Sequence, residues 1–225
     1  MSKTIVVTGV SRGIGHQVAL QAAAKGYRVF ALSRNIESFS SLKQIIPLKV
    51  DLSKEEEVEE ITKQIIAQVN SIDILINNAG YLINKPFMET SREAFISVFQ
   101  VNVFGLSSLT RMLLPKISKK GHVVNISSMG GITGTSKFPG LAAYSSSKAA
   151  VSILTELLAE EFKLTGPAFN ALALGAVQTE MLAQAFPDFQ APITAENMAD
   201  YILNFAEKGH HFYNGKVLPV SLSTP

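Results

Sequence analysis

Seven short runs of apolar residues, many of them β-branched, recur along the chain and are separated by longer segments of mixed polar and apolar character. They are Thr4–Thr8, Tyr27–Ser33, Ile46–Val50, Ile72–Ile76, His122–Ile126, Asn170–Leu174 and Val217–Val220. Continuous apolar runs of this length are typical of strands buried on both faces. Strands that alternate with helical segments form parallel βαβ units. The pattern therefore predicts an α/β fold with a doubly wound, mainly parallel seven-stranded sheet flanked by helices on both faces.

Polar residues mark the expected ends of several helices. Gly26 is expected to stop the first helix, because glycine readily adopts the left-handed conformation that ends helices. Ser53–Glu56 and Thr90–Glu93 have the spacing of capping boxes, in which a hydroxyl residue precedes a glutamate by one helical turn. Thr194 is expected to cap the last helix.

The composition narrows the class of protein. The chain has 225 residues, of which 47% are apolar, enough for one large core, and no linker, repeat or low-complexity run divides it. We therefore expect one domain over residues 1–225, with a short substrate lid around residues 180–193. The formal charge of +2 and the scattered lysines argue against nucleic-acid binding. The absence of Cys excludes disulfides, a thiolate metal site and a cysteine nucleophile.

No feature of the sequence suggests export, a membrane or a metal. The N-terminal residues lack the pattern of a secretory signal, and no apolar run reaches the length of a membrane span. A cytoplasmic location is therefore expected. The acidic cluster Glu55–Glu60 is interpreted as the solvated first turn of a helix rather than as a metal site.

Tyr144 and Lys148 are four residues apart in a segment that follows the run His122–Ile126. On a helix, this spacing places both side chains on one face. A lysine charge roughly 5 Å from the phenol, at an effective dielectric of about 20, favours the phenolate by about 3 kcal/mol, or about two pKa units. We therefore expect Tyr144 to act as a general acid/base. For this pair alone, the alternative is an exposed helix with an amphipathic Tyr and a solvated Lys.

A glycine-rich turn follows the first apolar run directly. It reads Gly9-Val-Ser-Arg-Gly13-Ile-Gly15, and a helical segment comes after it. A strand, a glycine turn and a helix in this order expose the N–H groups at the helix start to a phosphate. The glycine spacing differs from that of the common dinucleotide fingerprint, and the alternative is an ordinary tight turn.

The residues at the end of the apolar run Tyr27–Ser33 indicate whether a bound dinucleotide carries a 2′-phosphate. In dinucleotide-binding folds an acid near this point binds the ribose hydroxyls, whereas an Arg accommodates a 2′-phosphate. Ser33 occupies the acid position and Arg34 follows it. Arg12, in the glycine turn, is expected to approach the same phosphate. A charge-assisted pair predicts about a tenfold to hundredfold preference for the phosphorylated cofactor. The alternative for Arg34 is a solvated loop residue.

Taken together, these residues resemble the short-chain dehydrogenase/reductase family over essentially the whole chain. Thr8–Gly15 resembles the cofactor turn of that family, Asn77–Gly80 its sheet-stabilising motif, and Asp51 the residue that receives the adenine. The residues that resemble its catalytic tetrad are Asn102, Ser128, Tyr144 and Lys148.

The resemblance implies a Rossmann-type fold and hydride exchange between a nicotinamide and a carbonyl/alcohol pair. Tyr144 would exchange a proton with the substrate oxygen, and Ser128 would hydrogen-bond the same oxygen. Lys148 would hold the ribose hydroxyls and lower the pKa of Tyr144. Asn102 would anchor a water that connects Lys148 to solvent, although a bond to a backbone carbonyl is its structural alternative.

The resemblance also implies which residues surround the two ligands. Those expected to bind the cofactor are Gly9, Ser11, Arg12, Gly13, Ile14, Gly15, Ser33, Arg34, Asp51, Leu52, Asn78, Ala79, Gly80, Tyr144, Lys148, Gly175, Val177 and Thr179. Those expected to contact the substrate are Ser128, Tyr81, Met181 and Phe186.

The chain departs from the family pattern in three places. The gap from Ser128 to Tyr144 is longer by a few residues than the serine-to-tyrosine gap of the family. We place the extra residues near Thr135–Lys137, in a loop that bulges outward. The alternative is that Ser127 carries the catalytic hydroxyl. Leu174-Gly175 stands where the family has Pro-Gly, which would loosen the turn. The residues after Val220 lack the Asp-Gly-Gly common in the family.

We therefore predict an NADP(H)-dependent oxidoreductase that acts on a small or medium carbonyl/alcohol substrate. Two alternatives stay open: a non-catalytic NADP(H)-binding sensor or scaffold, and a reductase of the imine or pteridine type that uses the same tetrad. By the same resemblance a homodimer or homotetramer is expected, paired through helices at about residues 92–113 and 144–162.

Overall fold

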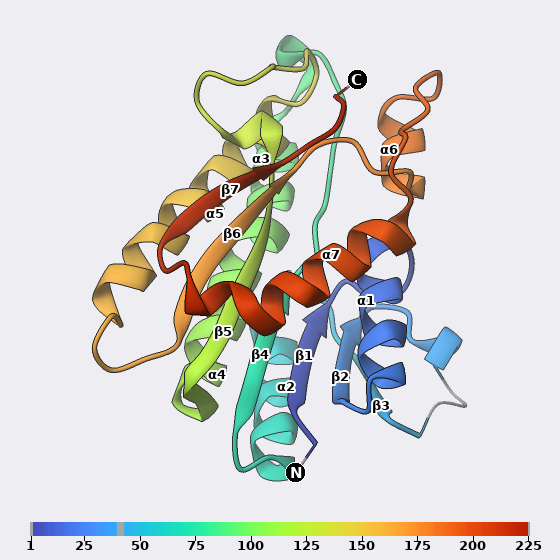
Figure 1. Cartoon of the computed structure of the whole chain (residues 1–225). Helices are drawn as coiled ribbons and strands as arrows, with labels where there is room; N and C mark the ends of the chain where they lie inside the picture. Colours follow the sequence, from blue (N-terminus) through green and yellow to red (C-terminus); the bar gives the residue numbers. More distant parts are fainter. Residues whose placement is uncertain (1, 40–42, 225) are drawn as a thin grey trace.

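The computed structural model describes residues 2–39 and 43–224, which form one seven-stranded sheet with helices on both sides (Figure 1). The strands are β1 (Thr4–Thr8), β2 (Arg28–Ser33), β3 (Ile45–Lys49), β4 (Ile72–Asn77), β5 (Ile117–Ser128), β6 (Ala168–Leu174) and β7 (Lys216–Val220). Their order is β3-β2-β1-β4-β5-β6-β7, and each neighbouring pair is parallel. The predicted doubly wound α/β fold is therefore confirmed.

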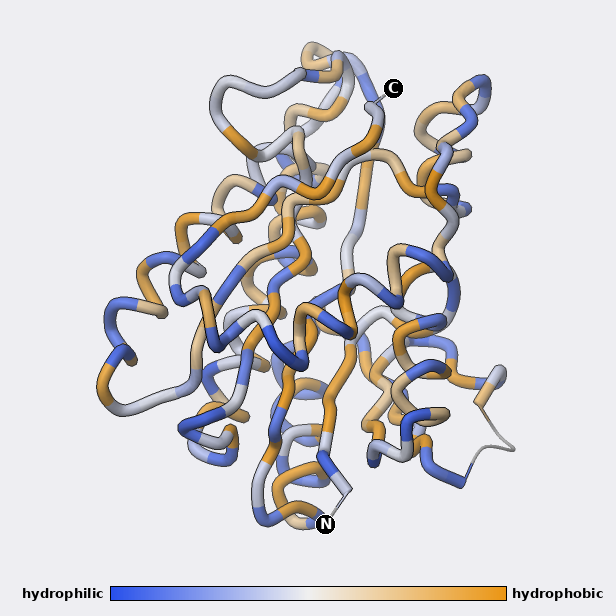
Figure 2. Tube along the Cα trace, in the orientation of Figure 1, coloured by the Kyte–Doolittle hydropathy of each residue, from blue (hydrophilic) through white to orange (hydrophobic). Residues whose placement is uncertain are grey.

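Two helical layers cover the sheet. The α-helices of the described residues are α1 (Gly13–Ala24), α2 (Glu55–Gln68), α3 (Arg92–Phe99), α4 (Leu106–Leu113), α5 (Ala142–Glu161), α6 (Glu180–Ala185) and α7 (Ala195–Lys208). Helices α1 and α7 bury Val18 and Ile202 in the core on one face, whereas α2 and α4 bury Ile65 and Leu113 on the other. Figure 2 shows apolar residues concentrated along the strands and polar ones on the outer turns of the helices.

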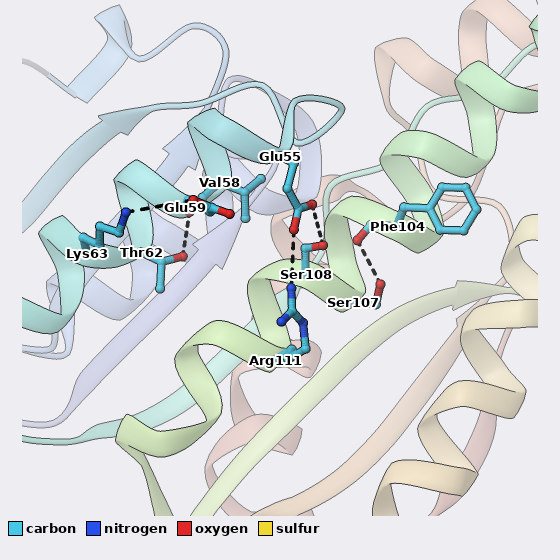
Figure 3. A network of polar contacts seen from close by, with 9 residues as sticks. All are labelled: Glu55, Val58, Glu59, Thr62, Lys63, Phe104, Ser107, Ser108 and Arg111. Carbon is cyan, nitrogen blue, oxygen red and sulfur yellow. Dashed lines mark hydrogen bonds and ion pairs between the residues drawn. The ribbon is translucent and has the colours of Figure 1, made fainter.

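Helices α2 and α4, which cover the same face, are joined through Glu55 (Figure 3). The hydroxyl of Ser108 donates to Oε2 of Glu55 at 2.7 Å, and Nη2 of Arg111 lies 3.4 Å from Oε1. One turn further along α2, Glu59 pairs with Lys63 at 3.9 Å. Glu55 therefore links α2 to α4, whereas the pair of Glu59 and Lys63 lies within α2. The described residues contain no group of three or more His, Asp or Glu side chains arranged to hold a metal ion.

Two of the four predicted helix ends are confirmed. Gly26 has a φ of +81° and follows Lys25, the C-cap of α1. Thr194 caps α7 by accepting a hydrogen bond from the N–H of Asn197 at 3.2 Å. No helix within residues 2–39 and 43–224 combines the length and apolar character that crossing a bilayer requires.

The other two predicted caps are wrong, because polar side chains form competing local hydrogen bonds. Ser53 does not cap α2, since its N–H and its hydroxyl both donate to Oδ1 of Asp51, at 3.0 and 2.8 Å. Ser91 rather than Thr90 occupies the capping position of α3, and the Thr90 hydroxyl donates to the carbonyl of Pro86 at 3.0 Å.

The helix expected to continue past Arg92 into Leu106 is interrupted. A π-helical turn, η3 (Gln100–Gly105), separates α3 from α4, and Asn102 lies within it. Such turns insert an extra residue into a helix and often occur at functional sites.

The strand order also indicates where a ligand would bind. All carboxyl ends of the strands meet at one edge, and β1 lies between β2 and β4, where the chain reverses its direction of travel across the sheet. The crevice at such a switch point is the usual ligand site of doubly wound sheets.

Candidate active site

The glycine turn connects β1 to α1 at this switch point. Gly9 has a φ of +72° and Gly13 of +60°, a region that residues with a side chain rarely adopt. A Cβ on Gly9 would also lie 2.7 Å from Cα of Ala79, so the turn approaches the end of β4 closely. Since α1 begins at Gly13, on the wall of a cleft, its first N–H groups are available to an anion.

Asn78 fixes the turn from the β4 side. Its Nδ2 donates to the carbonyls of Thr8 and Gly9 at 3.0 and 3.1 Å, and its own N–H donates to the Thr8 hydroxyl at 3.1 Å. Gly15 lies behind this junction, where a Cβ would be 2.3 Å from Nδ2 of Asn78. Gly15 therefore allows α1 to pack against Asn78, and it does not line the cleft.

Tyr144, Lys148 and Ser128 converge on another wall of the same cleft. The predicted placement of Tyr144 and Lys148 on one helix face is confirmed in α5, where Nζ of Lys148 lies 5.8 Å from the centre of the Tyr144 ring. Ser128 ends β5 and is hydrogen-bonded to the Tyr144 side chain. Lys148 is 3% exposed, and its Nζ donates to the carbonyl of Ile126 at 2.7 Å.

The prediction of a net lowering of the pKa of Tyr144 is wrong for these side chains. Burial raises the pKa of Tyr144 from 10.0 to about 12, although the hydrogen bond with Ser128 acts in the opposite direction. Burial likewise lowers the pKa of Lys148 from 10.5 to about 8. The prediction counted the attraction between the two groups but not their removal from water, which disfavours both charged forms. At neutral pH Tyr144 therefore keeps its proton and Lys148 keeps its charge.

Ser127, the alternative to Ser128, uses its hydroxyl elsewhere. Its Oγ donates to the carbonyl of Lys148 at 2.9 Å and lies 2.8 Å from Oγ of Ser152, and the residue is 2% exposed. Ser128 is therefore the hydroxyl beside Tyr144.

The extra residues between Ser128 and Tyr144 lie in an irregular, mostly exposed loop, where the sequence placed them. This loop is held by its own side chains: the hydroxyl of Thr135 donates to the carbonyl of Ile132 at 2.8 Å, and Nζ of Lys137 lies 3.0 Å from that hydroxyl. The insertion therefore does not displace the serine from the tyrosine.

Asn102 is fully buried in η3 and does not line the cleft. Its Oδ1 accepts a hydrogen bond from the N–H of Tyr81 at 2.7 Å, and its Nδ2 donates to the Tyr81 carbonyl at 3.0 Å and to Oγ of Ser147 at 2.8 Å. The backbone contacts match the structural alternative for this residue. A Cβ on Gly80 would lie 3.6 Å from Nζ of Lys148 and 3.8 Å from Oδ1 of Asn102, so both groups flank one glycine. The water link between them stays a prediction.

Ser33, Arg34 and Asp51 lie at the other end of the cleft, after β2 and β3. Burial would raise the pKa of Asp51, but hydrogen bonds from the N–H and hydroxyl of Ser53 and the charge of Arg34 together hold it below its ordinary value. Within the described part of the chain, neither Arg34 nor Arg12 has a carboxylate at ion-pair distance. Both guanidinium groups are exposed and available to a phosphate.

The cleft brings together every residue predicted for the site except Gly15 and Asn102, around a volume of about 290 Å³. Other wall residues were missed, among them Leu82, Phe138 and Leu141, which lie in irregular segments without a recognisable motif. The available signal was the isolated aromatic Phe138 in a polar stretch before Tyr144.

The loop after β6, where Leu174 replaces the expected proline, is held by another part of the chain. The N–H of Gly175 donates to the carbonyl of Val220 and that of Ala176 to the carbonyl of Ser223, both at 2.9 Å. A Cβ on Gly175 would lie 2.1 Å from Oγ of Ser221. The segment after β7 therefore fixes this loop, which was expected to be loose.

Comparison with known proteins decides the family. A model of the short chain dehydrogenase family matches residues 3–190. The chain belongs to the short-chain dehydrogenase family. Its relatives include the 3-oxoacyl-[acyl-carrier-protein] reductase FabG of Staphylococcus epidermidis, 31% identical over 199 residues that cover 80% of this chain and 78% of that protein. Another short-chain dehydrogenase, the NADPH-dependent pterin aldehyde reductase of Arabidopsis thaliana, is 33% identical over 218 residues, 90% of this chain and 88% of that protein.

Solved short-chain dehydrogenase structures have the same fold. ElxO with NADP bound matches with a TM-score of 0.86 and 32% identity, covering 98% of both chains. 4-Hydroxyisoleucine dehydrogenase complexed with NADH matches with a TM-score of 0.87 and 26% identity, covering 98% of this chain and 97% of that one. The chain is thus an NAD(P)-dependent oxidoreductase acting on the carbonyl/alcohol pair.

The wall of the cleft fits such a dinucleotide. The start of α1 and two unpaired guanidinium groups offer anion-binding positions at one end, and the Ser128–Tyr144–Lys148 group offers a proton at the other.

Proposed function

We propose that this short-chain dehydrogenase uses NADP(H) to interconvert a small or medium carbonyl compound and its alcohol, with Tyr144 as general acid/base. The observation that carries the proposal is that Tyr144, Ser128 and Lys148 share one cleft with the glycine turn and Arg34. We assign the predicted cofactor and substrate residues on the cleft wall to those roles, and residues 180–193 to a lid of the same single domain.

The chain's own residues supply proton transfer and orientation. When bound, a reduced nicotinamide supplies a hydride to the carbonyl carbon and is left oxidised. Tyr144 gives its proton to the carbonyl oxygen as that oxygen gains the electron pair of the broken π bond, and Ser128 hydrogen-bonds the same oxygen. The phenol is protonated at neutral pH, as proton donation in reduction requires, but its pKa of about 12 makes it a weak acid, so the phenolate must be stabilised as the proton leaves. The Lys148 ammonium stabilises the phenolate that remains.

The preference for the phosphorylated cofactor rests on the residues after β2. Ser33 stands where an acid would bind ribose hydroxyls, and the exposed Arg34 and Arg12 can neutralise a 2′-phosphate. Two relatives support the same choice, since ElxO is solved with NADP and the Arabidopsis reductase is NADPH-dependent.

A Tyr144→Phe variant tests the proposal. It keeps the ring but lacks the proton, so kcat for carbonyl reduction should fall by about 10²–10⁴-fold, while the Kd for NADPH stays within about twofold. A matched Tyr201→Phe variant on α7, 43% exposed in the wild type, should behave like the wild type. Undiminished turnover in Tyr144→Phe would refute the assignment, and absence of turnover in the wild type with intact NADPH binding would favour a cofactor-binding sensor.

We also propose that the protein forms a homodimer or homotetramer. Phe104 on η3 and Leu157 on α5 are 51% and 62% exposed, which is high for large apolar side chains on neighbouring helices. Light scattering of the wild type and a Leu157→Glu variant tests this. The cytoplasmic location stays a prediction that cell fractionation would test.

A further inference from the structure

Two aromatic rings share the wall of the cleft with the Ser128 hydroxyl. A Cβ on Gly130 would lie 3.7 Å from Cδ2 of Phe138 and 3.7 Å from Oγ of Ser128, so ring and hydroxyl border the same small space. The ring of Phe186 from the lid meets that of Phe138 edge-on, with centres 5.9 Å apart and planes at 69°. Both rings lie on the wall of the cleft. The three segments 81–86, 129–141 and 180–189, the last of which includes α6, together form what we call the roof.

The roof segments are tied to one another by hydrogen bonds. Nδ2 of Asn84 donates to the carbonyl of Ala185 at 2.7 Å, and the N–H of Lys85 donates to the carbonyl of Gly140 at 3.0 Å. A Cβ on Gly140, whose φ is +88°, would lie 2.0 Å from Oδ1 of Asn84, so a side chain there would separate the two loops. The aromatic pair is therefore held in place, and a ligand beneath it loses little binding energy to ordering these loops.

No cation of the described residues is available to a substrate beneath the roof. The charged residues on the cleft wall are Arg12, Arg34, Asp51, Lys148 and Glu180. Arg12 immediately precedes α1, and Arg34 and Asp51 follow β2 and β3. A Cβ on Gly13 would be 3.7 Å from Oε2 of Glu180, which places that carboxylate at the glycine turn. One N–H of the buried Lys148 ammonium donates to the Ile126 carbonyl. The proposed function commits the rest of this ammonium to the ribose hydroxyls of the cofactor and to Tyr144, so it is not free to pair with a substrate anion.

The lysines of the roof do not provide a cation for a substrate either. Lys85 and Lys137 are absent from the cleft wall, and Nζ of Lys137 donates to the Thr135 carbonyl at 3.2 Å. A carboxylate beside Ser128 would be desolvated without a partner, which is strongly unfavourable.

We infer that the substrate is an uncharged carbonyl compound with an aromatic ring next to the reacting carbon, and that keto acids are rejected. The ring would extend the edge-to-face arrangement of Phe138 and Phe186, which aromatic groups prefer. This inference rests on the proposed function and narrows its substrate class.

The test compares three alcohols that differ in one group each: 1-phenylethanol, 1-cyclohexylethanol and mandelate. Their Kd values are measured by calorimetry on the protein saturated with NADPH, where alcohol and reduced cofactor cannot react. Binding is compared rather than rate because the corresponding ketones differ in intrinsic reactivity. We expect 1-phenylethanol to bind several-fold more tightly than 1-cyclohexylethanol and at least about tenfold more tightly than mandelate. NADPH-dependent reduction of acetophenone should accompany this order.

Leucine variants assign the preference to the two rings. Phe138→Leu and Phe186→Leu keep an apolar wall but lack the ring, so each should lose the preference for phenyl over cyclohexyl. Phe212→Leu, at a residue 80% exposed near the end of α7, should keep it.

Each outcome has a distinct meaning. Mandelate binding as tightly as 1-phenylethanol, cyclohexyl binding as tightly as phenyl, or no alcohol binding to the NADPH complex overturns the substrate inference and leaves the oxidoreductase proposal standing. Acetophenone reduction that persists unchanged in Tyr144→Phe overturns the proposed function instead.

Discussion

Nζ of Lys148 donates a hydrogen bond to the carbonyl of Ile126 at 2.7 Å from a position that is 3% exposed. One backbone acceptor satisfies one of the three N–H groups of an ammonium, and burial lowers its pKa to about 8. A lysine kept where its charge is costly is typical of a functional site rather than of a structural core.

Replacing Lys148 by Met should remove a pH dependence of stability. The lysine's folded pKa of about 8 lies below its unfolded value of 10.5, so between these values the unfolded chain holds a proton that the folded chain has lost. The free energy of unfolding of the wild type should therefore rise with pH in this window, by about 2 kcal/mol from about pH 8 to about pH 9.5, relative to Lys148→Met. Urea unfolding at the two pH values measures it. A Lys63→Met control on α2 should track the wild type, and parallel pH profiles for wild type and Lys148→Met would contradict the prediction.

Charge reversal at Arg34 should change the cofactor preference. A glutamate would lose the pair with a 2′-phosphate and offer an acceptor to ribose hydroxyls, so the ratio of the Kd for NADH to that for NADPH should fall by about tenfold to hundredfold or more. Fluorescence titration of both cofactors measures the ratio. Arg92→Glu at the start of α3, remote from the cleft wall, is the matched control. An unchanged ratio would show that Arg34 does not contact the phosphate.

The sequence was sufficient to predict those parts of the site that are formed by residues close together in the chain. The strand, turn and helix around Gly9 and Gly13 and the one-turn spacing of Tyr144 and Lys148 are local patterns, and the structure places them on one cleft as expected. Caps were harder to predict, because the Ser53 side chain can either accept a hydrogen bond from the start of α2 or donate one to a neighbour, and here Asp51 accepts from both its N–H and its hydroxyl.

The roof lay beyond sequence reasoning, because its contacts join distant segments. Asn84 and Ala185 are separated by 101 positions, and nothing in either segment indicates the other. The raised pKa of Tyr144 was missed for a related reason: burial depends on loops that close over the helix only in the folded chain.

Removing the Asn84 side chain should loosen the lid. Asn84→Ala loses the 2.7 Å hydrogen bond to the Ala185 carbonyl, worth about 1 kcal/mol, so amide exchange in residues 180–189 should accelerate about fivefold. KM for the carbonyl substrate should rise by a similar factor, while the Kd for NADPH changes little. Exchange measured by mass spectrometry reports the first effect. The control is Asn204→Ala, which removes an exposed hydrogen bond to the Asp200 carbonyl at 2.9 Å on α7. Equal amide exchange of residues 180–189 in the wild type and both variants would show that the Asn84 hydrogen bond does not hold this segment.

His122 provides a second buried titratable group, on β5. The residue is fully buried, its Nε2 accepts from Nδ2 of Asn170 at 2.9 Å, and its Nδ1 lies 3.1 Å from the carbonyl of Ala206. Burial lowers its pKa from 6.5 to about 4; the Ala206 contact opposes this shift, and the neighbouring His210 and His211 add to it. The folded state therefore holds a neutral imidazole with both ring nitrogens engaged.

Acid should destabilise the protein through this histidine. Below pH 6.5 the unfolded chain binds a proton at His122, whereas the folded chain binds it only near pH 4, so stability is complete above 6.5 and is lost as the pH falls. The loss should reach about 2 kcal/mol between pH 6.5 and about pH 5. His122→Gln keeps a polar side chain without the titration, and its urea unfolding should lack this part of the pH slope, whereas His211→Gln at an exposed ring should retain most of it. If wild type and His122→Gln lost stability in parallel over this range, other groups would be responsible, and His122 would not be the site that takes up the proton on unfolding.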